Sequence, residues 1–189
     1  MGKLLENLNI TVAIGFILAI IMLFVFHADT ISGVVVFRWL HVFFGIMWIG
    51  LLYYFNFVQI PTMPSIPGEL KPGVSKFIAP KALFFFRWGA AFTVLTGLIV
   101  AMLNAYLVEA LSLQPGFQLI GIAMWLALIM AFNVWFIIWP NQKRALGLVE
   151  ADDASKAKSA RTAMLASRLN TLLSIPMLYG MATYQSLAA

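Results

Sequence analysis

Cysteine is absent from this chain, and charged residues are scarce. None of the 189 residues is Cys, and Asp, Glu, Lys and Arg together make up 10% of them. Without cysteine there are no disulfides, no thiolate-ligated metal or iron–sulfur site, and no covalently attached c-type haem, which needs Cys-x-x-Cys-His. No Gly-rich phosphate loop, Ser-His-Asp triad or zinc motif can be assembled either. A soluble domain carries about a quarter charged residues, so the shortage also argues against a soluble protein.

Apolar residues take the place of the missing charges. They form 62% of the chain, and the mean hydropathy is +0.94. A globule of 21.0 kDa has too little interior for so many, so the composition indicates an integral membrane protein. The formal net charge of +5 then reports membrane topology, and no basic soluble face suggests nucleic-acid binding.

Five apolar runs are long enough to cross a hydrocarbon core, which takes about 20 helical residues. We predict an all-α bundle, a single transmembrane domain over 1–189, with spans at about 8–26, 34–60, 83–107, 117–139 and 163–187. The short segment between the first two spans predicts an antiparallel hairpin. The Pro-rich segment 61–81 predicts an extended, irregular loop, and Pro140 predicts the end of the fourth span.

Basic residues in the loops predict the orientation of the bundle. All eight Lys and Arg of the loops lie in the second and fourth, and none lies in the first or third: Lys71, Lys76, Lys81, Lys143, Arg144, Lys156, Lys158 and Arg161. The positive-inside rule then places the N-terminus in the cytoplasm and the C-terminus outside. Within 141–161, acidic residues precede basic ones, which favours a helix on the cytoplasmic surface that continues into the fifth span.

Two ionisable residues mark the start of the second span, in "FRWLHVFFGIMWIG". Arg38 and His41 are one helical turn apart and share a face. The imidazole of His41 can ligate a haem iron or another metal, or shuttle a proton. With a haem, Arg38 would pair with a propionate, and Trp48 is deep enough to line the pocket. The alternatives are a histidine hydrogen-bonded to a neighbouring helix and an arginine that reaches the headgroups.

His27 is a secondary candidate, at the outer end of the first span. His41 would lie roughly 12 Å deeper at 1.5 Å per residue, so both histidines on one haem across this hairpin would be strained. A haem on His41 would have an open or non-histidine sixth position, or a ligand from another subunit. The alternative for His27 is an ordinary interfacial residue.

Other polar residues inside the spans have plainer explanations. An amide stripe favours interhelical hydrogen bonds: Asn56, Gln59, Asn104, Asn133 and Asn170. Arg87 and Arg168, near the inner ends of the third and fifth spans, are typical of arginines that reach the headgroups.

The stretches "RWLHVFFGIMWIGLLYYFNFVQIPTMP", "FRWGAAFTVLTGL" and "NVWFIIWPNQKRALG" resemble the membrane domain of bacterial urate hydroxylase, the PuuD type. The first also resembles, more weakly, haem-binding membrane proteins of the HemJ type. The resemblance implies a bacterial inner-membrane redox domain with b-type haem, His41, Arg38 and Trp48 at its site, and a separate cytochrome c as electron acceptor.

Two functional hypotheses follow. The first is a haem-binding electron-transfer protein of that family. The second is a non-catalytic structural or accessory protein that self-associates as a homo-oligomer or joins a larger membrane complex, surrounded by membrane lipids. A transporter is disfavoured, because only Pro176 interrupts a span.

Overall fold

The structure is a computed structural model that describes residues 2–184, and it divides into two compact units at Val36. The first unit contains α1 (Gly2–Leu5), α2 (Leu8–His27), the 3-10 turn η1 (Ala28–Thr30) and the first residues of α3 (Gly33–Tyr53). Asn7 caps α2 by accepting hydrogen bonds from the backbone N–H groups of Asn9 and Ile10. The second unit, from Phe37 onward, holds the remaining helices.

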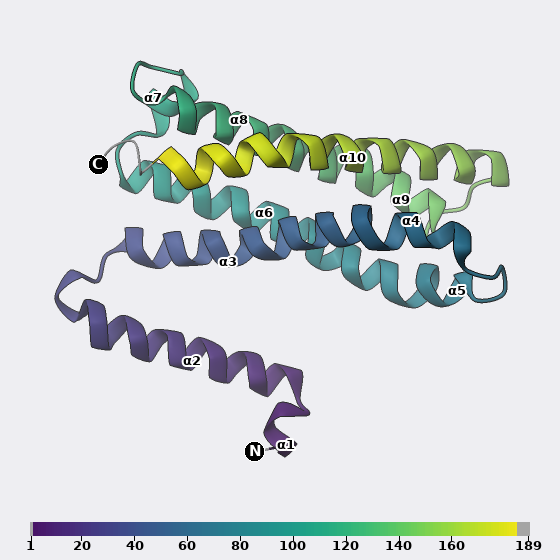
Figure 1. Cartoon of the computed structure of the whole chain (residues 1–189), viewed down its shortest axis with the longest axis horizontal. Coiled ribbons are helices and arrows are strands. Elements are labelled where there is room, and N and C mark those ends of the chain that lie inside the picture. Colours follow the sequence, from purple (N-terminus) through teal and green to yellow (C-terminus); the bar gives the residue numbers. More distant parts are fainter. Residues whose placement is uncertain (1, 185–189) are drawn as a thin grey trace. The chain divides into compact units, whose positions relative to one another are not determined.

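The second unit is a bundle of long helices (Figure 1). α3 continues through η2 (Tyr54–Gln59), α4 (Ile60–Thr62) and η3 (Met63–Ser65). A second long helix is built from α5 (Lys71–Gly73), η4 (Val74–Ile78) and α6 (Ala79–Leu103). The short α7 (Leu107–Leu111) leads to a third, made of α8 (Gln118–Phe132), η5 (Asn133–Ile138) and α9 (Trp139–Ala145), and α10 (Asp153–Thr183) packs along α8 and α9.

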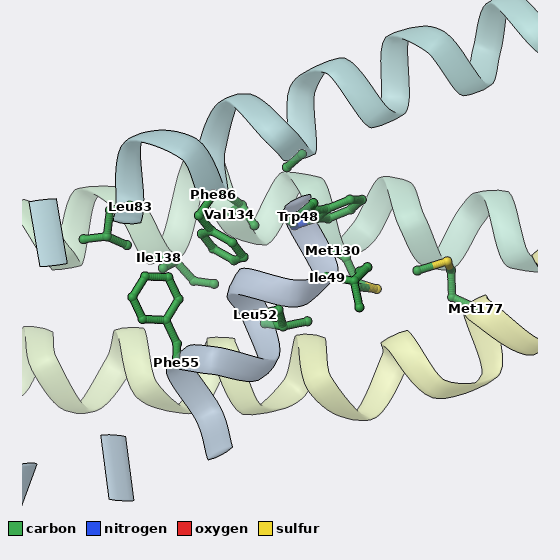
Figure 2. Packing of buried hydrophobic residues seen from close by; sticks show 11 residues of the cluster. Trp48, Ile49, Leu52, Phe55, Leu83, Phe86, Met130, Val134, Ile138 and Met177 are labelled. Carbon is green, nitrogen blue, oxygen red and sulfur yellow. The ribbon is translucent and has the colours of Figure 1, made fainter. Parts of the chain in front are cut away.

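An apolar core holds these helices together. Figure 2 shows its side chains between α3, α6, α8 and α10, with the indole of Trp48 fully buried. The core comprises Trp48, Ile49, Leu52, Phe55, Leu83, Phe86, Ala90, Met130, Val134, Ile138 and Met177. Many large apolar side chains remain on the outside of the bundle, as in a protein whose solvent is lipid.

Within the described residues, four helices are long and apolar enough to cross a membrane: Leu8–Thr30, Gly33–Ser65, Lys71–Leu103 and Gln118–Ala145. The prediction of a multi-pass helical membrane protein is therefore confirmed. The fifth predicted span, 163–187, is helical as far as Thr183 within α10, and its residues 185–187 lie outside the described part.

α10 is less apolar than these four helices, and several of the polar residues responsible point inward. Ser167, Asn170 and Ser174 are buried against the bundle, while Leu172 and Ile175 are exposed. A helix that turns polar groups to protein and apolar groups outward suits a lipid environment better than its average hydropathy indicates.

The prediction of an irregular 61–81 loop is wrong, since only 66–70 fall outside helical structure there. Pro72 lies in the first turn of its helix, where the first N–H groups have no intrahelical acceptor. Pro61 and Pro64 lie inside the continuous helix Gly33–Ser65, and Pro80 lies inside Lys71–Leu103. The prediction that Pro140 ends the fourth span is also wrong, because the helix continues through Pro140 to Ala145.

Three of these prolines also explain the π-helical segments η2, η4 and η5, each of which ends two residues before a proline. The residue ahead of each proline donates its N–H five residues back, as in the bond from Trp139 to the Val134 carbonyl. A proline ring clashes with the carbonyl four residues before it, and the wider π turn relieves that clash. The π segments thus follow from proline placement and by themselves indicate no site.

The segment predicted as an ordered inner helix is largely confirmed as helical. α10 begins at Asp153, behind the cap residue Asp152, and runs without a break into the fifth predicted span. The residues between Ala145 and Asp152 form the turn that precedes it.

Candidate functional site

A cavity of about 640 Å³ opens between α3, α6, α8 and the C-terminal part of α10. Its wall is mostly apolar, with Ile49, Leu98, Met124 and Met181 among the lining residues. The polar side chains that reach it are few and include Arg38, His41, Thr93, Tyr106 and Tyr184. Ligand pockets typically measure about 300–1,000 Å³ and combine an apolar wall with a few polar groups, so this cavity has the size and lining of a small-molecule site.

His41 is held in one tautomer at the wall of the cavity. Its Nδ1 lies 2.9 Å from the backbone carbonyl oxygen of Thr93 on α6. A carbonyl oxygen only accepts, so Nδ1 carries the proton and donates it. Nε2 then keeps its lone pair and has no hydrogen-bond partner among the described residues. The hydrogen bond to a neighbouring helix that the sequence allowed is therefore present, and it leaves the other ring nitrogen available to a ligand.

The Thr93 carbonyl that accepts from His41 belongs to a regular turn of α6. The Thr93 hydroxyl donates to the Gly89 carbonyl at 2.6 Å, and the Thr96 hydroxyl approaches the Thr93 carbonyl at 3.2 Å. The acceptor of His41 is thus a fixed backbone group of a regular helix. A metal-ligating histidine usually has such a partner on its other nitrogen, because the partner sets the tautomer and the ring orientation.

Gly97 makes room for the imidazole. A Cβ at position 97 would lie 2.7 Å from Cε1 and 2.9 Å from Nδ1 of His41, closer than side-chain carbons approach other atoms. Only glycine lets α6 and the ring of His41 meet at this distance. Thr93 and Gly97, one turn apart on α6, therefore fix the imidazole from two sides.

The mouth of the cavity combines a cation with aromatic rings. Arg38 is exposed there, one turn before His41 on α3. The rings of Tyr106 and Tyr184 lie 5.9 Å apart, and Phe117 stacks on Tyr106 at 6.1 Å. Burial is the main cause that raises the pKa of Tyr106, with Tyr184 adding to the rise and Arg38 opposing it. The phenol therefore stays protonated at neutral pH and keeps a donor at the mouth.

The remaining predicted site residues have different positions. Trp48 lines the inner part of the cavity, and its indole is fully buried in the core. His27 is exposed at the end of α2, in the first unit, and does not belong to this cavity. No group of three or more His, Asp or Glu side chains gathers among the described residues. Among the described residues that line the cavity, His41 is the one histidine.

A second polar region lies below the cavity and ties α10 to the bundle. Asn133 donates to Asn170 at 2.9 Å, and Asn170 donates to the Met130 carbonyl at 2.9 Å. Asn56 donates to Ser167 at 2.7 Å. Asn56, Asn133 and Asn170 of the predicted amide stripe thus take part in interhelical hydrogen bonds. Helix packing explains this region.

Sequence reasoning missed Thr93 and Tyr106, and it did not place Gly97 beside His41. A threonine and a glycine four residues apart in an apolar helix are typical of helix packing, and only the contact with His41 reveals their role. A family model described as urate oxidase N-terminal matches residues 87–186, more than half of the chain. This range includes those three residues and leaves His41 and Arg38 outside it. The chain matches no curated protein and no solved structure.

Proposed function

The chain belongs to the urate oxidase N-terminal family, and from that premise we propose that it is a membrane redox protein that binds a b-type haem through His41. The observation that carries the proposal is the hydrogen bond from His41 Nδ1 to the Thr93 carbonyl oxygen. It leaves Nε2 unprotonated at the wall of an apolar cavity of about 640 Å³. This arrangement is the one that an axial histidine needs.

Each residue has a separate task in this proposal. His41 would hold the haem iron through Nε2, and the Thr93 carbonyl and Gly97 hold the ring in orientation. Arg38 at the mouth would pair with an anionic propionate. The apolar wall, including Trp48, excludes water, which sets the polarity around the group. A bound b-type haem would supply one-electron transfer.

The described residues of the second unit offer one histidine to a haem. Among the described residues of the second unit, no other histidine reaches the cavity, since His41 is the only one there. We therefore propose a haem with one histidine ligand and an open or non-histidine sixth position. His27, exposed at the end of α2 in the first unit, has no role in this proposal.

We also propose five spans, with α10 as the fifth, and the N-terminus in the cytoplasm of a bacterial inner membrane. The buried polar face and exposed apolar face of α10 support the fifth span. The basic residues near α5, α9 and the start of α10 lie at one end of the bundle (Figure 1) and support that end as the inner one. The cavity mouth is then at the outer face, where a separate cytochrome c would accept electrons.

A haem titration of the purified full chain tests the proposal. The wild type is expected to bind haem b at one equivalent, with a shifted Soret band. His41→Ala should weaken binding by more than about tenfold, because it removes the axial nitrogen. His27→Ala is the matched control, since it removes the other histidine and should bind as the wild type does.

Equal binding by His41→Ala and the wild type would refute the assignment of the ligand. A folded wild type that binds no haem, and that purifies as a larger particle or with an enzyme, would support the accessory role instead. Particle mass in lipid discs, recorded on the same sample, reports the homo-oligomer that both hypotheses allow.

A further inference from the structure

Arg87 is a cation inside a membrane-crossing helix that has no counter-ion. It lies within the Lys71–Leu103 span. The one ion pair between described residues joins Lys156 and Asp153, so no carboxylate lies within 4 Å of Arg87 there. Two of its three guanidinium nitrogens, Nε and Nη1, are buried without a hydrogen-bond partner. A charged group inside a span is costly and usually has a partner.

The guanidinium rests on an aromatic ring. Its Cζ lies 3.3 Å from the centroid of the Trp139 indole, which is a close cation–π stack. A stack on the face of the ring leaves the N–H groups at the guanidinium edge without acceptors. The contact with Trp139 therefore fixes the position of Arg87 but does not satisfy its hydrogen bonds.

Arg87 and Trp139 lie at a similar depth in the bundle, as counting residues along their two helices indicates. Arg87 precedes the end of α6 at Leu103 by 16 residues, about 24 Å at 1.5 Å per residue. Trp139 follows the start of α8 at Gln118 by 21 residues, about 32 Å on the same scale. With its extended side chain, Arg87 thus reaches the level of Trp139, about one hydrocarbon thickness from the far end of the spans. This level is that of phospholipid headgroups.

Lys143 brings a second cation to the same ring. Its Nζ lies 5.6 Å from the Trp139 centroid, so the two distances to the ring limit the separation of Lys143 Nζ and Arg87 Cζ to about 9 Å. Lys143 has no ion-pair partner among the described residues either. Two unpaired cations beside one indole, at headgroup depth, match an anion that offers several oxygens.

We propose that Arg87, Trp139 and Lys143 form a binding site for the phosphate group of an anionic phospholipid. The phosphate oxygens accept from the ammonium of Lys143 and from Nη2 of Arg87, the guanidinium nitrogen that is not among the buried atoms. The indole of Trp139 lies at the boundary between headgroup and acyl chain, where tryptophan is favoured. The site is at the α9 end of the bundle (Figure 1), and the cavity mouth is at the opposite end, so it does not depend on haem.

Lipid discs of defined composition test this site. The full chain is placed in phosphatidylcholine discs that contain increasing mole fractions of phosphatidylglycerol, and the thermal unfolding midpoint is measured. The wild type should be stabilised in a saturable manner. Arg87→Gln should raise the half-saturating fraction about fivefold, and Lys143→Gln should raise it in the same direction.

Arg144→Gln is the matched control, because Arg144 is the exposed neighbour of Lys143 on α9 and no contact of it with Trp139 is seen. It removes the same charge and should leave the half-saturating fraction close to that of the wild type. If Arg87→Gln does not fold, Arg87→Lys replaces it. Arg87→Lys keeps the charge but loses the planar stack and fork, and it should also weaken the response.

Two outcomes overturn the proposal. The first is an equal response to phosphatidylglycerol in the wild type, Arg87→Gln and Arg144→Gln, which would indicate a diffuse charge effect. The second is stabilisation by inorganic phosphate in pure phosphatidylcholine discs that Arg87→Gln abolishes, which would make the ligand a soluble phosphate instead of a lipid.

Discussion

Replacement of Gly97 by alanine tests whether α6 positions His41. The new Cβ would lie 2.7 Å from Cε1 of His41, against the 3.4 Å at which ordinary contacts begin. The ring must therefore move by about 0.7 Å or α6 must move away, at a cost of about 1–3 kcal/mol for such overpacking. Either movement distorts the 2.9 Å hydrogen bond to the Thr93 carbonyl.

We expect Gly97→Ala to lose more haem affinity than its loss of folding stability accounts for. Disturbing the hydrogen-bond partner of a ligating histidine typically lowers affinity by about 10–100-fold. Haem titration of the purified full chain measures this value, and circular dichroism confirms that the variant is folded. Gly50→Ala is the matched control, since Gly50 also lines the cavity but an added Cβ there meets nothing within 4 Å.

Gly50→Ala should bind haem with the affinity of the wild type. A folded Gly97→Ala variant with that same affinity would refute the reasoning, because the imidazole would then not need the position that α6 imposes on it.

Three further predictions concern α10 and its surroundings. Asn170→Ala should lower the free energy of unfolding in detergent by about 1–2 kcal/mol, since it leaves the Asn133 side-chain amide without its acceptor and removes one of the donors to the Met130 carbonyl; Thr171→Ala, which loses a bond within one helix, should cost less. Hydrogen bonds from the backbone N–H and hydroxyl of Ser155 lower the pKa of Asp152, so the cap stabilises α10 above the unfolded pKa of about 3.9. That stability is lost as the pH falls through the lower folded pKa, and Asp152→Asn should remove this pH dependence from helix unfolding followed by circular dichroism. Ser155→Cys should react with an impermeant thiol reagent in inverted vesicles but not in intact cells; the opposite pattern would reverse the proposed topology.

The sequence predicted the helical membrane class because long apolar runs have few other solutions in lipid. It misplaced helix ends where prolines occur, since a proline that a π-helical turn accommodates inside a helix and a proline in a loop look alike in the sequence. Ser167, Asn170 and Ser174 lower the hydropathy of α10, and only packing shows that they face the bundle.

The candidate site was predictable only in part. Arg38 and His41 share a face at a spacing that helical geometry fixes, so the sequence was enough to pair them. Thr93 and Gly97 lie about 50 residues away, and the contact exists only because α3 and α6 pack together. The cavity itself depends on four helices, which no local pattern encodes.

The absorption spectrum of the full chain, purified from its native membrane without added haem, tests the central claim most directly. The account predicts a Soret band in the wild type and in His27→Ala, and its loss in a folded His41→Ala. A colourless wild type that is folded and monodisperse, or a Soret band that survives in His41→Ala, would contradict it.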